Sequence, residues 1–347
     1  MMPLKLRAFG SVLLVALFLG ACSSAAPQGA SSAPPVSSAA AAGTSAVAGA
    51  QPSGSAAAAR SRMVAGFAVI SATQLPLWGA AQGGFFTNHG LDVQVIQAGA
   101  GSTGLSALLS GEISVLGTSA GSTMNAVAEG HPLVWLGSTM DKLQQYMMVK
   151  KDRNDISRPE DMRGKKVGVT TPGSISDSAA HYVAYQAGLK EGQDYTIVRM
   201  NDLPVITAAA QNGAIDVAFG SSGVLGLAET GLKVVLDLTK LPGAYSSTGY
   251  ATSRAYYEQH PQEIKAFVAA LSEAVKRAKS DPDFAAQVLG ERLKVTDRKT
   301  LDGVAAEFLP DMNLEIGVNR EGLETARKTS ALSIPKLEQF EVAKMLP

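Results

Sequence analysis

The chain has 347 residues, of which 46% are hydrophobic and 17% are charged, so it can bury the core of one large or two medium domains. Its 30 basic and 30 acidic residues are balanced, without the clustered basic face that a nucleic-acid-binding protein needs. The single cysteine excludes a disulfide framework, and the 4 histidines have no metal-ligand spacing. We therefore expect no cofactor, no metal ion and no nucleic-acid partner.

Residues 1–21 have the layout of a cleaved export signal. Lys5 and Arg7 precede an apolar run from Val12 to Leu19, which is too short to span a bilayer. Small residues then lead directly to Cys22, and this arrangement resembles the lipobox of bacterial lipoproteins, in which the cysteine becomes the acylated first residue. We predict lipidation of Cys22 and membrane attachment through a lipid anchor. An ordinary signal peptide followed by an unmodified cysteine is the alternative.

Residues 22–62 consist almost entirely of alanine, serine, glycine and proline. They contain no acidic residue and no apolar periodicity, so they cannot bury enough surface to offset their chain entropy. We interpret this stretch as a flexible tether that separates a folded domain from the membrane surface.

From Met63 onward, strand-like runs alternate with helix-like runs, and part of the pattern repeats at a spacing of 102 residues. Gly111, Ile113, Val115, Ser119 and Gly121 recur, without a gap, as Gly213, Ile215, Val217, Ser221 and Gly223. This predicts an α/β protein of two similar lobes, each an open and mostly parallel sheet flanked by helices. We assign residues 63–145 to lobe I and 146–245 to lobe II, and expect residues 246–347 to return to lobe I and end in helices. Apolar periodicity predicts the first of these over residues 261–279.

Loops that follow strands in both halves are rich in glycine and hydroxyl side chains. Residues 164–177, for example, indicate a strand, a Pro-Gly break and a helix start with Ser174, Ser176 and Asp177. Ligands of open α/β sheets bind at the carboxyl ends of the strands, and a helix start offers free N–H groups to a polar or anionic group. A plain N-cap without a ligand is the alternative for any single loop. The recurrence of such loops predicts a binding cleft between the lobes.

Two of these loops also match enzyme motifs. Residues 99–104 fit the dinucleotide-binding fingerprint, but the acidic residue expected about 20 positions later is missing. Residues 117–121 fit the nucleophile elbow of serine hydrolases, with Ser119 as nucleophile and with Asp216 or Asp237 and then His260 in the expected order. An exported serine hydrolase is therefore the alternative function. It is weakened because Ser221 repeats the serine in the second half and because His260 precedes Pro261 at a helix start.

Residues 63–280 resemble the substrate-binding proteins of ABC importers, in the branch that serves nitrate, alkanesulfonates, taurine and thiamine-pyrimidine precursors. The resemblance rests on the lipobox and tether, the turn at 83–86 before the stretch 90–93, the pair 111–115 and 213–217, and the stretch 161–169. It implies the two-lobed periplasmic-binding-protein fold of type 2, an extracytoplasmic location, and an ABC permease with its ATPase as partners. We also expect a monomer. The ligand contacts that it implies are Ser71, Trp78, Thr118, Ser119, Ser174, Ser176, Phe219, Ser221 and Tyr250.

The ligand class is left open between two chemistries. A sulfonate or similar oxyanion can be held by N–H groups and hydroxyls at helix starts. An aromatic or heterocyclic molecule would instead stack on rings such as those of Trp78, Phe219, Tyr245 and Tyr250. The yeast-type pyrimidine-precursor synthase, an enzyme within the resemblance, depends on a cysteine-rich segment that this chain lacks. The sequence therefore predicts a binding protein and not an enzyme.

Overall fold

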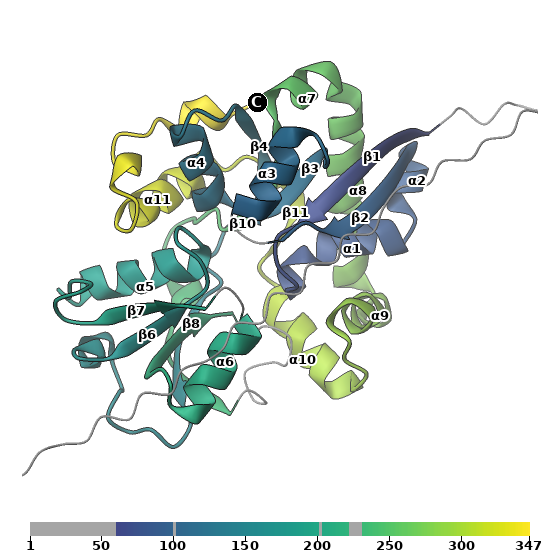
Figure 1. Ribbon diagram of the computed structural model, residues 1–347. Coiled ribbons are helices and arrows are strands. Elements are labelled where there is room, and N and C mark those ends of the chain that lie inside the picture. The colour runs from purple at the N-terminus through teal and green to yellow at the C-terminus, as the bar shows by residue number, and fades with distance from the viewer. Residues whose placement is uncertain (1–59, 100–101, 201–202, 222–230) are drawn as a thin grey trace, which may run out of the picture. The chain divides into compact units, whose positions relative to one another are not determined.

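A computed structural model describes residues 60–99, 102–200, 203–221 and 231–347 (Figure 1). The predicted export signal, lipidation site Cys22 and most of the predicted tether lie outside these residues, as do Ser222 and Gly223 of one predicted binding loop. The described chain forms two β-sheets, each with helices on both faces. We call the part built on the first sheet lobe I and the part built on the second sheet lobe II.

Lobe I contains a six-stranded sheet. Across the sheet, its strands are β11 (Met312–Gly317), β4 (Leu133–Met140), β10 (Thr248–Ser253), β3 (Val115–Ser119), β1 (Ser61–Phe67) and β2 (Leu91–Gln97). Strand β1 pairs in parallel with β2 and β3, whereas β10 pairs antiparallel with β3 and β4, and β11 pairs antiparallel with β4. Strands β1 to β4 therefore run in one direction, against β10 and β11.

Lobe II contains a five-stranded sheet. Across it, the strands are β7 (Thr196–Arg199), β6 (Lys166–Val169), β8 (Val217–Gly220), β5 (Tyr146–Lys150) and β9 (Leu232–Asp237). Strand β6 pairs in parallel with β7 and β8, and β5 pairs antiparallel with β8 and β9. The strand that enters from the other lobe, β5 here and β10 in lobe I, runs antiparallel to both of its neighbours.

The two sheets share one strand order, which explains the sequence repeat. The order β2-β1-β3-β10-β4 in lobe I corresponds to β7-β6-β8-β5-β9 in lobe II. Val115 and Val217 begin the equivalent strands β3 and β8, and the turns before them contain Gly111 and Gly213, both with φ of 80°. The predicted two-lobed α/β fold is confirmed. The prediction of mostly parallel sheets holds for strand direction. The hydrogen-bonded pairs are mixed, because β10 and β5 are inserted antiparallel and β11 pairs antiparallel with β4.

Helices connect the strands and continue after β10. They are α1 (Leu75–Gln82), α2 (Phe85–Asn88), α3 (Ser102–Ser110), α4 (Ala120–Ala128), α5 (Ile175–Gln186), α6 (Leu203–Asn212), α7 (Arg254–Gln259), α8 (Pro261–Ser280), α9 (Pro282–Leu293), α10 (Arg298–Phe308) and α11 (Arg320–Ala331). Short 3₁₀ turns are η1 (Ala72–Gln74), η2 (Pro159–Met162), η3 (Leu238–Lys240), η4 (Pro335–Leu337) and η5 (Val342–Met345). The helix predicted over residues 261–279 is α8.

Alternating side chains on the strands separate the apolar core into layers. On β5, Met147 and Val149 face the layer shared with α5, whereas Tyr146 and Met148 face α6. This follows from the two-residue period of a strand, which places neighbours on opposite faces. The layer under α5 continues into lobe I beneath α4, and α11 packs against both of these helices. The other face of the lobe I sheet packs against α1, α8, α9 and α10.

The structure corrects two boundaries of the sequence interpretation. The composition assigns Ser61 and Arg62 to the tether, but they pair with Leu91 and Asp92 as the first residues of β1. Polar side chains at the end of a strand add nothing to its hydrophobic pattern. The strand therefore begins before the first apolar residue. The C-terminal part, expected to be helical, also contributes β11 to the lobe I sheet.

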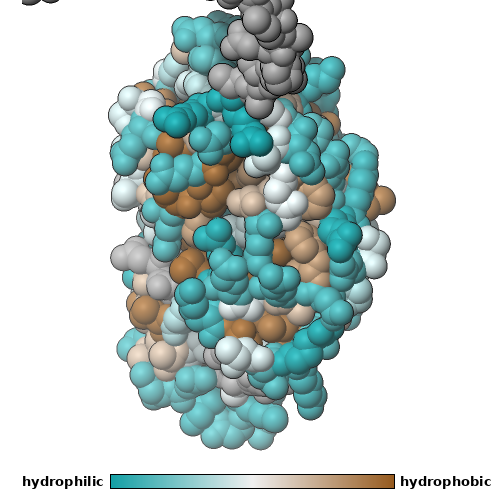
Figure 2. Space-filling view, turned by 90° about the vertical axis from the view of Figure 1, so that its right-hand side faces the viewer, coloured by the Kyte–Doolittle hydropathy of each residue, from teal (hydrophilic) through white to brown (hydrophobic). Residues whose placement is uncertain are grey.

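Hydrophilic side chains cover most of the face shown in Figure 2, with hydrophobic patches between them. Within the described part of the chain, no helix is both long enough and apolar enough to cross a membrane.

Candidate functional site

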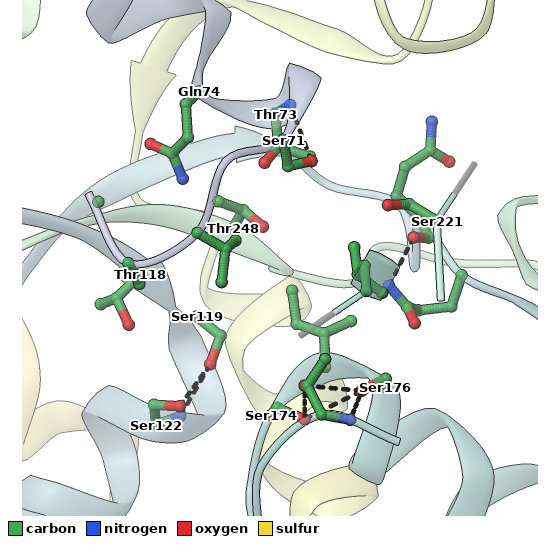
Figure 3. Close-up of a pocket in the computed structure, with 18 of the residues that line it drawn as sticks. Ser71, Thr73, Gln74, Thr118, Ser119, Ser122, Ser174, Ser176, Ser221 and Thr248 are labelled. Atoms are coloured by element: carbon green, nitrogen blue, oxygen red, sulfur yellow. Dashed lines mark hydrogen bonds between the residues drawn. The ribbon is translucent and has the colours of Figure 1, made fainter. Parts of the chain in front are cut away.

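A pocket of about 110 Å³ lies where the carboxyl ends of strands from both sheets meet (Figure 3). Its lining comes from the loops after β1, β6 and β8, from the end of β3, from the first turns of α4, α5 and α6, from the start of β10, and from the segment that crosses from β4 to β5. The polar residues of this lining are Ser71, Thr73, Gln74, Thr118, Ser119, Ser122, Gln144, Gln145, Thr170, Thr171, Ser174, Ser176, Ser221 and Thr248. The site therefore occupies the position at which open α/β sheets bind ligands.

The wall from lobe I is built by residues that start helices. Ser71 is the N-cap of η1, where its hydroxyl accepts from the backbone N–H of Thr73 at 3.4 Å. Ser119 is the N-cap of α4: its Oγ accepts from the N–H of Ser122 at 3.1 Å and donates to Oγ of Ser122 at 2.8 Å. The caps place both hydroxyls at the pocket, because an N-cap side chain folds back over its own helix start.

The wall from lobe II contains three hydroxyls in one cluster. Oγ1 of Thr170 donates to Oγ of Ser174 at 2.8 Å and lies 2.9 Å from Oγ of Ser176. Ser176 also accepts from the N–H of Thr170, and Ser174 caps α5 by accepting from the N–H of Asp177. The stretch expected to form strand, loop and helix start does so. These hydrogen bonds hold the loop after β6 in a defined shape beside the pocket.

Beneath this loop lies a group of side chains joined by ion pairs and hydrogen bonds. The carboxylate of Asp177 is 1% exposed, and it accepts from the N–H of Gly173 at 3.0 Å and from Arg199 at 3.2 Å. Glu191 in turn contacts Arg199 at 3.5 Å and His181 at 2.9 Å. A buried carboxylate with such partners shapes the loop at its own helix start, where a negative charge is favoured.

Glutamine amides form the remaining polar surface. Gln144 and Gln145 lie on the crossing segment between β4 and β5, and Gln74 ends η1. A Cβ atom at position 117 would lie 2.5 Å from Oε1 of Gln74, so glycine is needed there for this amide to occupy its place. None of the lining residues that the structure describes has an ionisable side chain. The described lining is therefore neutral and rich in hydrogen-bonding groups.

The two lobes touch directly beside the pocket. Oγ of Ser122 at the start of α4 lies 3.5 Å from the carbonyl oxygen of Gly173, its acceptor in lobe II. Behind this contact, Oγ of Ser330 on α11 lies 3.3 Å from Oγ of Ser178 on α5. A Cβ at Gly121 on α4 would lie 2.6 Å from the same Ser330 oxygen. Small residues thus let α4, α5 and α11 approach closely at the back of the pocket.

Six of the nine predicted contact residues line the pocket, namely Ser71, Thr118, Ser119, Ser174, Ser176 and Ser221. Their contact with a ligand stays a prediction. The three predicted aromatic contacts are instead buried in the core: Trp78 is 0% exposed, Phe219 is 0% exposed and Tyr250 is 1% exposed.

The aromatic placements have clear physical reasons. Trp78 packs edge-on against Phe67 at 5.5 Å, inside the layer between α1 and the sheet. Tyr250 packs against Phe267 of α8 at 5.9 Å, and burial raises the pKa of its hydroxyl. Phe219 alternates with Ala218 along β8 and faces the layer under α5. Large apolar rings gain more from the core than from a small polar pocket.

The nine predicted contacts omit eight polar residues of the lining, namely the three glutamines, Thr73, Ser122, Thr170, Thr171 and Thr248. Ser122 belongs to a loop that was singled out, and its spacing of three from the Ser119 cap could have indicated it. Gln144 and Gln145 follow no glycine-rich loop, and only the packing of the two lobes brings the crossing segment to the pocket.

The residues of the hydrolase alternative are occupied elsewhere. Ser119 caps α4, Asp216 contacts Arg153 at 2.5 Å, and Asp237 accepts from the N–H of Thr239 at the start of η3. Nδ1 of His260 lies 3.1 Å from Glu263 at the start of α8. The described structure gives no hydrogen bond between Ser119 and a histidine, and it does not support this alternative.

The chain matches known proteins in sequence. The model of the NMT1/THI5 like family matches residues 72–285, which is more than half of the chain. The chain belongs to the NMT1/THI5-like family. The taurine-binding periplasmic protein of Escherichia coli (strain K12) is 28% identical over 206 residues, which are 57% of this chain and 61% of that protein. The match to this relative therefore spans about three fifths of its length.

Solved structures agree with this family in fold. A protein from Bordetella bronchiseptica RB50 superposes with a TM-score of 0.71 at 22% identity, covering 83% of this chain and 95% of the other. The periplasmic aliphatic sulphonate binding protein SsuA of Escherichia coli superposes with a TM-score of 0.69 at 21% identity, covering 82% and 92%. The chain thus has the two-lobed fold of periplasmic binding proteins.

Proposed function

We propose that the chain is the extracytoplasmic substrate-binding protein of an ABC importer, which captures a small organic solute and delivers it to a permease and its ATPase. The observation that carries this proposal is the polar pocket between two lobes of duplicated topology. Family membership and the likeness to the taurine-binding protein support it. Both candidate ligand classes of the sequence interpretation, a sulfonate-like anion and an aromatic or heterocyclic molecule, belong to this proposal.

Two chain crossings between the lobes support capture by closure. The chain passes from β4 to β5 and returns from η3 to β10, and the loops after the strands of both lobes form the pocket. Closure about such connections encloses a ligand between hydroxyl-rich walls and excludes water from it. The protein would bind one molecule per chain.

Thermal unfolding of the full chain in the presence of sulfonates, nitrate, pyrimidines and flavins tests this function. A ligand at 100 times its dissociation constant is expected to add about 2.7 kcal/mol to the free energy of unfolding. Titration calorimetry of each hit should give a stoichiometry of one. Failure of all four classes to raise the unfolding temperature would contradict the proposal.

The anchor is a separate part of the proposal. We expect Cys22 to carry lipid, so that the protein fractionates with membranes, and we expect Cys22→Ser to release it or leave it unprocessed. Ligand affinity should stay unchanged, because the binding residues all lie beyond residue 67. A Cys22→Ser protein that remains in the membrane fraction after processing would overturn the lipid anchor.

A further inference from the structure

The crossing segment presents two hydrogen-bond acceptors that no described donor satisfies. Nε2 of Gln144 donates to the carbonyl oxygen of Glu307 at 3.3 Å, and Nε2 of Gln145 donates to the carbonyl oxygen of Gln144 at 2.8 Å. Because a carbonyl oxygen only accepts, these bonds define which end of each amide is the donor. The two remaining Oε1 atoms are buried without a partner among the described residues.

Such orphaned acceptors point to a donor on a bound molecule. The side chains of Gln144 and Gln145 are 3% and 7% exposed, and a buried acceptor without a donor is unfavourable. Both residues line the pocket, so a ligand bound there lies beside these two amides. An anionic oxygen placed there would instead meet two negative ends of amide dipoles.

The rest of the pocket offers little to balance a charged ligand. The described lining has no ionisable side chain, and Ser119 and Ser174 already occupy N–H groups at the starts of α4 and α5. An ammonium group would find no carboxylate in that lining, and the ring of Trp78 lies in the core. Removing an ion from water without such partners is strongly unfavourable.

We propose that Gln144 and Gln145 determine specificity by accepting hydrogen bonds from an uncharged N–H donor of the ligand, of the carboxamide, sulfonamide or urea type. This inference rests on the proposed binding function and narrows its ligand class. The hydroxyl-rich walls hold the acceptor atoms of the same molecule, since serine and threonine hydroxyls can donate. The cavity of about 110 Å³ restricts the ligand to a small solute.

Matched pairs of molecules that differ in one group test the inference on the unmodified full chain. Titration calorimetry compares methanesulfonamide with methanesulfonate, and nicotinamide with nicotinate, with taurine as the ammonium-bearing probe. We expect each amide to bind at least about tenfold more tightly than its acid, because the acid lacks the donor and carries a charge. Equal or tighter binding of the acids or of taurine would overturn the inference while leaving the binding function intact. Failure of both amides to bind would also overturn it.

Substitutions measure how much Gln144 and Gln145 contribute to ligand binding, apart from the rest of the pocket. Gln144→Met and Gln145→Met keep the side-chain length and remove the acceptor, and each should weaken amide binding roughly 2- to 13-fold. Gln82→Met is the matched control, since Oε1 of Gln82 is likewise buried without a partner in the described chain but lies outside the pocket lining. Unchanged amide binding in both pocket variants would refute the assignment. If a variant fails to fold, the matched pairs on the unmodified chain still decide the question.

Discussion

Ser119 shows how one hydroxyl serves both a helix and a pocket. It caps α4 through the N–H of Ser122, and it lies on the lobe I wall beside Thr118. The hydrogen-bond acceptor in the cap is also the atom that a hydrolase would use as nucleophile, so a single substitution separates the two functions.

Ser119→Ala is expected to lower the free energy of unfolding by about 1 kcal/mol through loss of the cap. It should weaken the binding of any pocket ligand by about 0.5–1.5 kcal/mol, as expected for one neutral hydrogen bond. Urea unfolding and titration calorimetry measure the two effects. Ser253→Ala is the control, because Ser253 caps α7 in the same way outside the pocket and should change only stability. Ester hydrolysis by the unmodified chain that disappears in Ser119→Ala would instead establish the hydrolase.

Asp216 is the acidic residue whose partners predict a pH-dependent stability. Burial opposes its ionisation, but hydrogen bonds from the N–H of Lys166 at 2.7 Å and from Arg153 at 2.5 Å outweigh burial and lower the pKa of the carboxyl. A lowered pKa stabilises the folded state above the unfolded pKa of about 3.9, and this stabilisation is lost as the pH falls further.

Asp216→Asn should therefore lower the free energy of unfolding at pH 7 by roughly 1–3 kcal/mol, because an amide nitrogen would face the Arg153 guanidinium. The difference from the unmodified protein should shrink as the pH falls below about 4. Urea titrations across this range measure it. Asp92→Asn, at an exposed pair with Arg62 on the sheet edge, is the control with a small effect at every pH. If the free energy of unfolding of Asp216→Asn stays below that of the unmodified protein by the same amount down to the lowest pH, ionisation of Asp216 does not stabilise the fold.

At the scale of elements, β10 completes lobe I by inserting between β3 and β4. The insertion requires close backbone approach: a Cβ at Gly249 would lie 2.0 Å from the carbonyl oxygen of Gly137 and 2.5 Å from the ring of Trp135. Backbone atoms cannot yield as a flexible side chain can, so a glycine at this position is a condition for the pairing.

Gly249→Ala is thus expected to destabilise the fold by more than about 2 kcal/mol. The control is Gly303→Ala in α10, where a Cβ would meet nothing within 4 Å. That substitution should be neutral or stabilising by up to about 1 kcal/mol, since alanine favours a helix. Denaturant unfolding of both variants tests the pair. Equal stability of the two variants would show that β10 and β4 can move slightly apart without lowering the free energy of unfolding.

At the scale of the whole molecule, the chain divides into two units, and the second, which contains both sheets, begins at Ala56. The first strand starts at Ser61, whose N–H donates to the carbonyl oxygen of Gly90 at 3.1 Å. The signal and the greater part of the tether should consequently be dispensable for folding and for binding, whereas the first two residues of β1 should not.

A protein that begins at Ala56 is expected to unfold with the same free energy as the mature chain and to bind the same ligand. One that begins at Met63 should lose about 1–3 kcal/mol, since it lacks the β1 residues that pair with Leu91 and Asp92. Urea unfolding compares the two proteins. If the protein that begins at Met63 is equally stable, Ser61 and Arg62 do not contribute to the stability of the sheet. If the protein that begins at Ala56 does not fold, the tether has a structural role.

Much of this architecture is encoded locally and is therefore readable from the sequence. Strand alternation, such as that of Tyr146 to Val149, follows from burial on two faces, and the repeat of 102 residues reflects a repeated order of strands. The serines that begin η1, α4 and α5 could be recognised because an N-cap is a short-range signal. These features predicted the fold class and three of the pocket residues, and the family resemblance added Thr118, Ser176 and Ser221.

The identity of the pocket-lining side chains depends on tertiary packing. Trp78, Phe219 and Tyr250 sit close in sequence to pocket loops, yet each points into a core layer because that is where its ring buries most surface. Gln144 and Gln145 have no local signature and reach the pocket only because two sheets meet at the crossing segment. Local sequence patterns were enough to predict two lobes and their hydroxyl-capped helix starts. Which side chains face the space between the lobes depends on long-range contacts that no local pattern records.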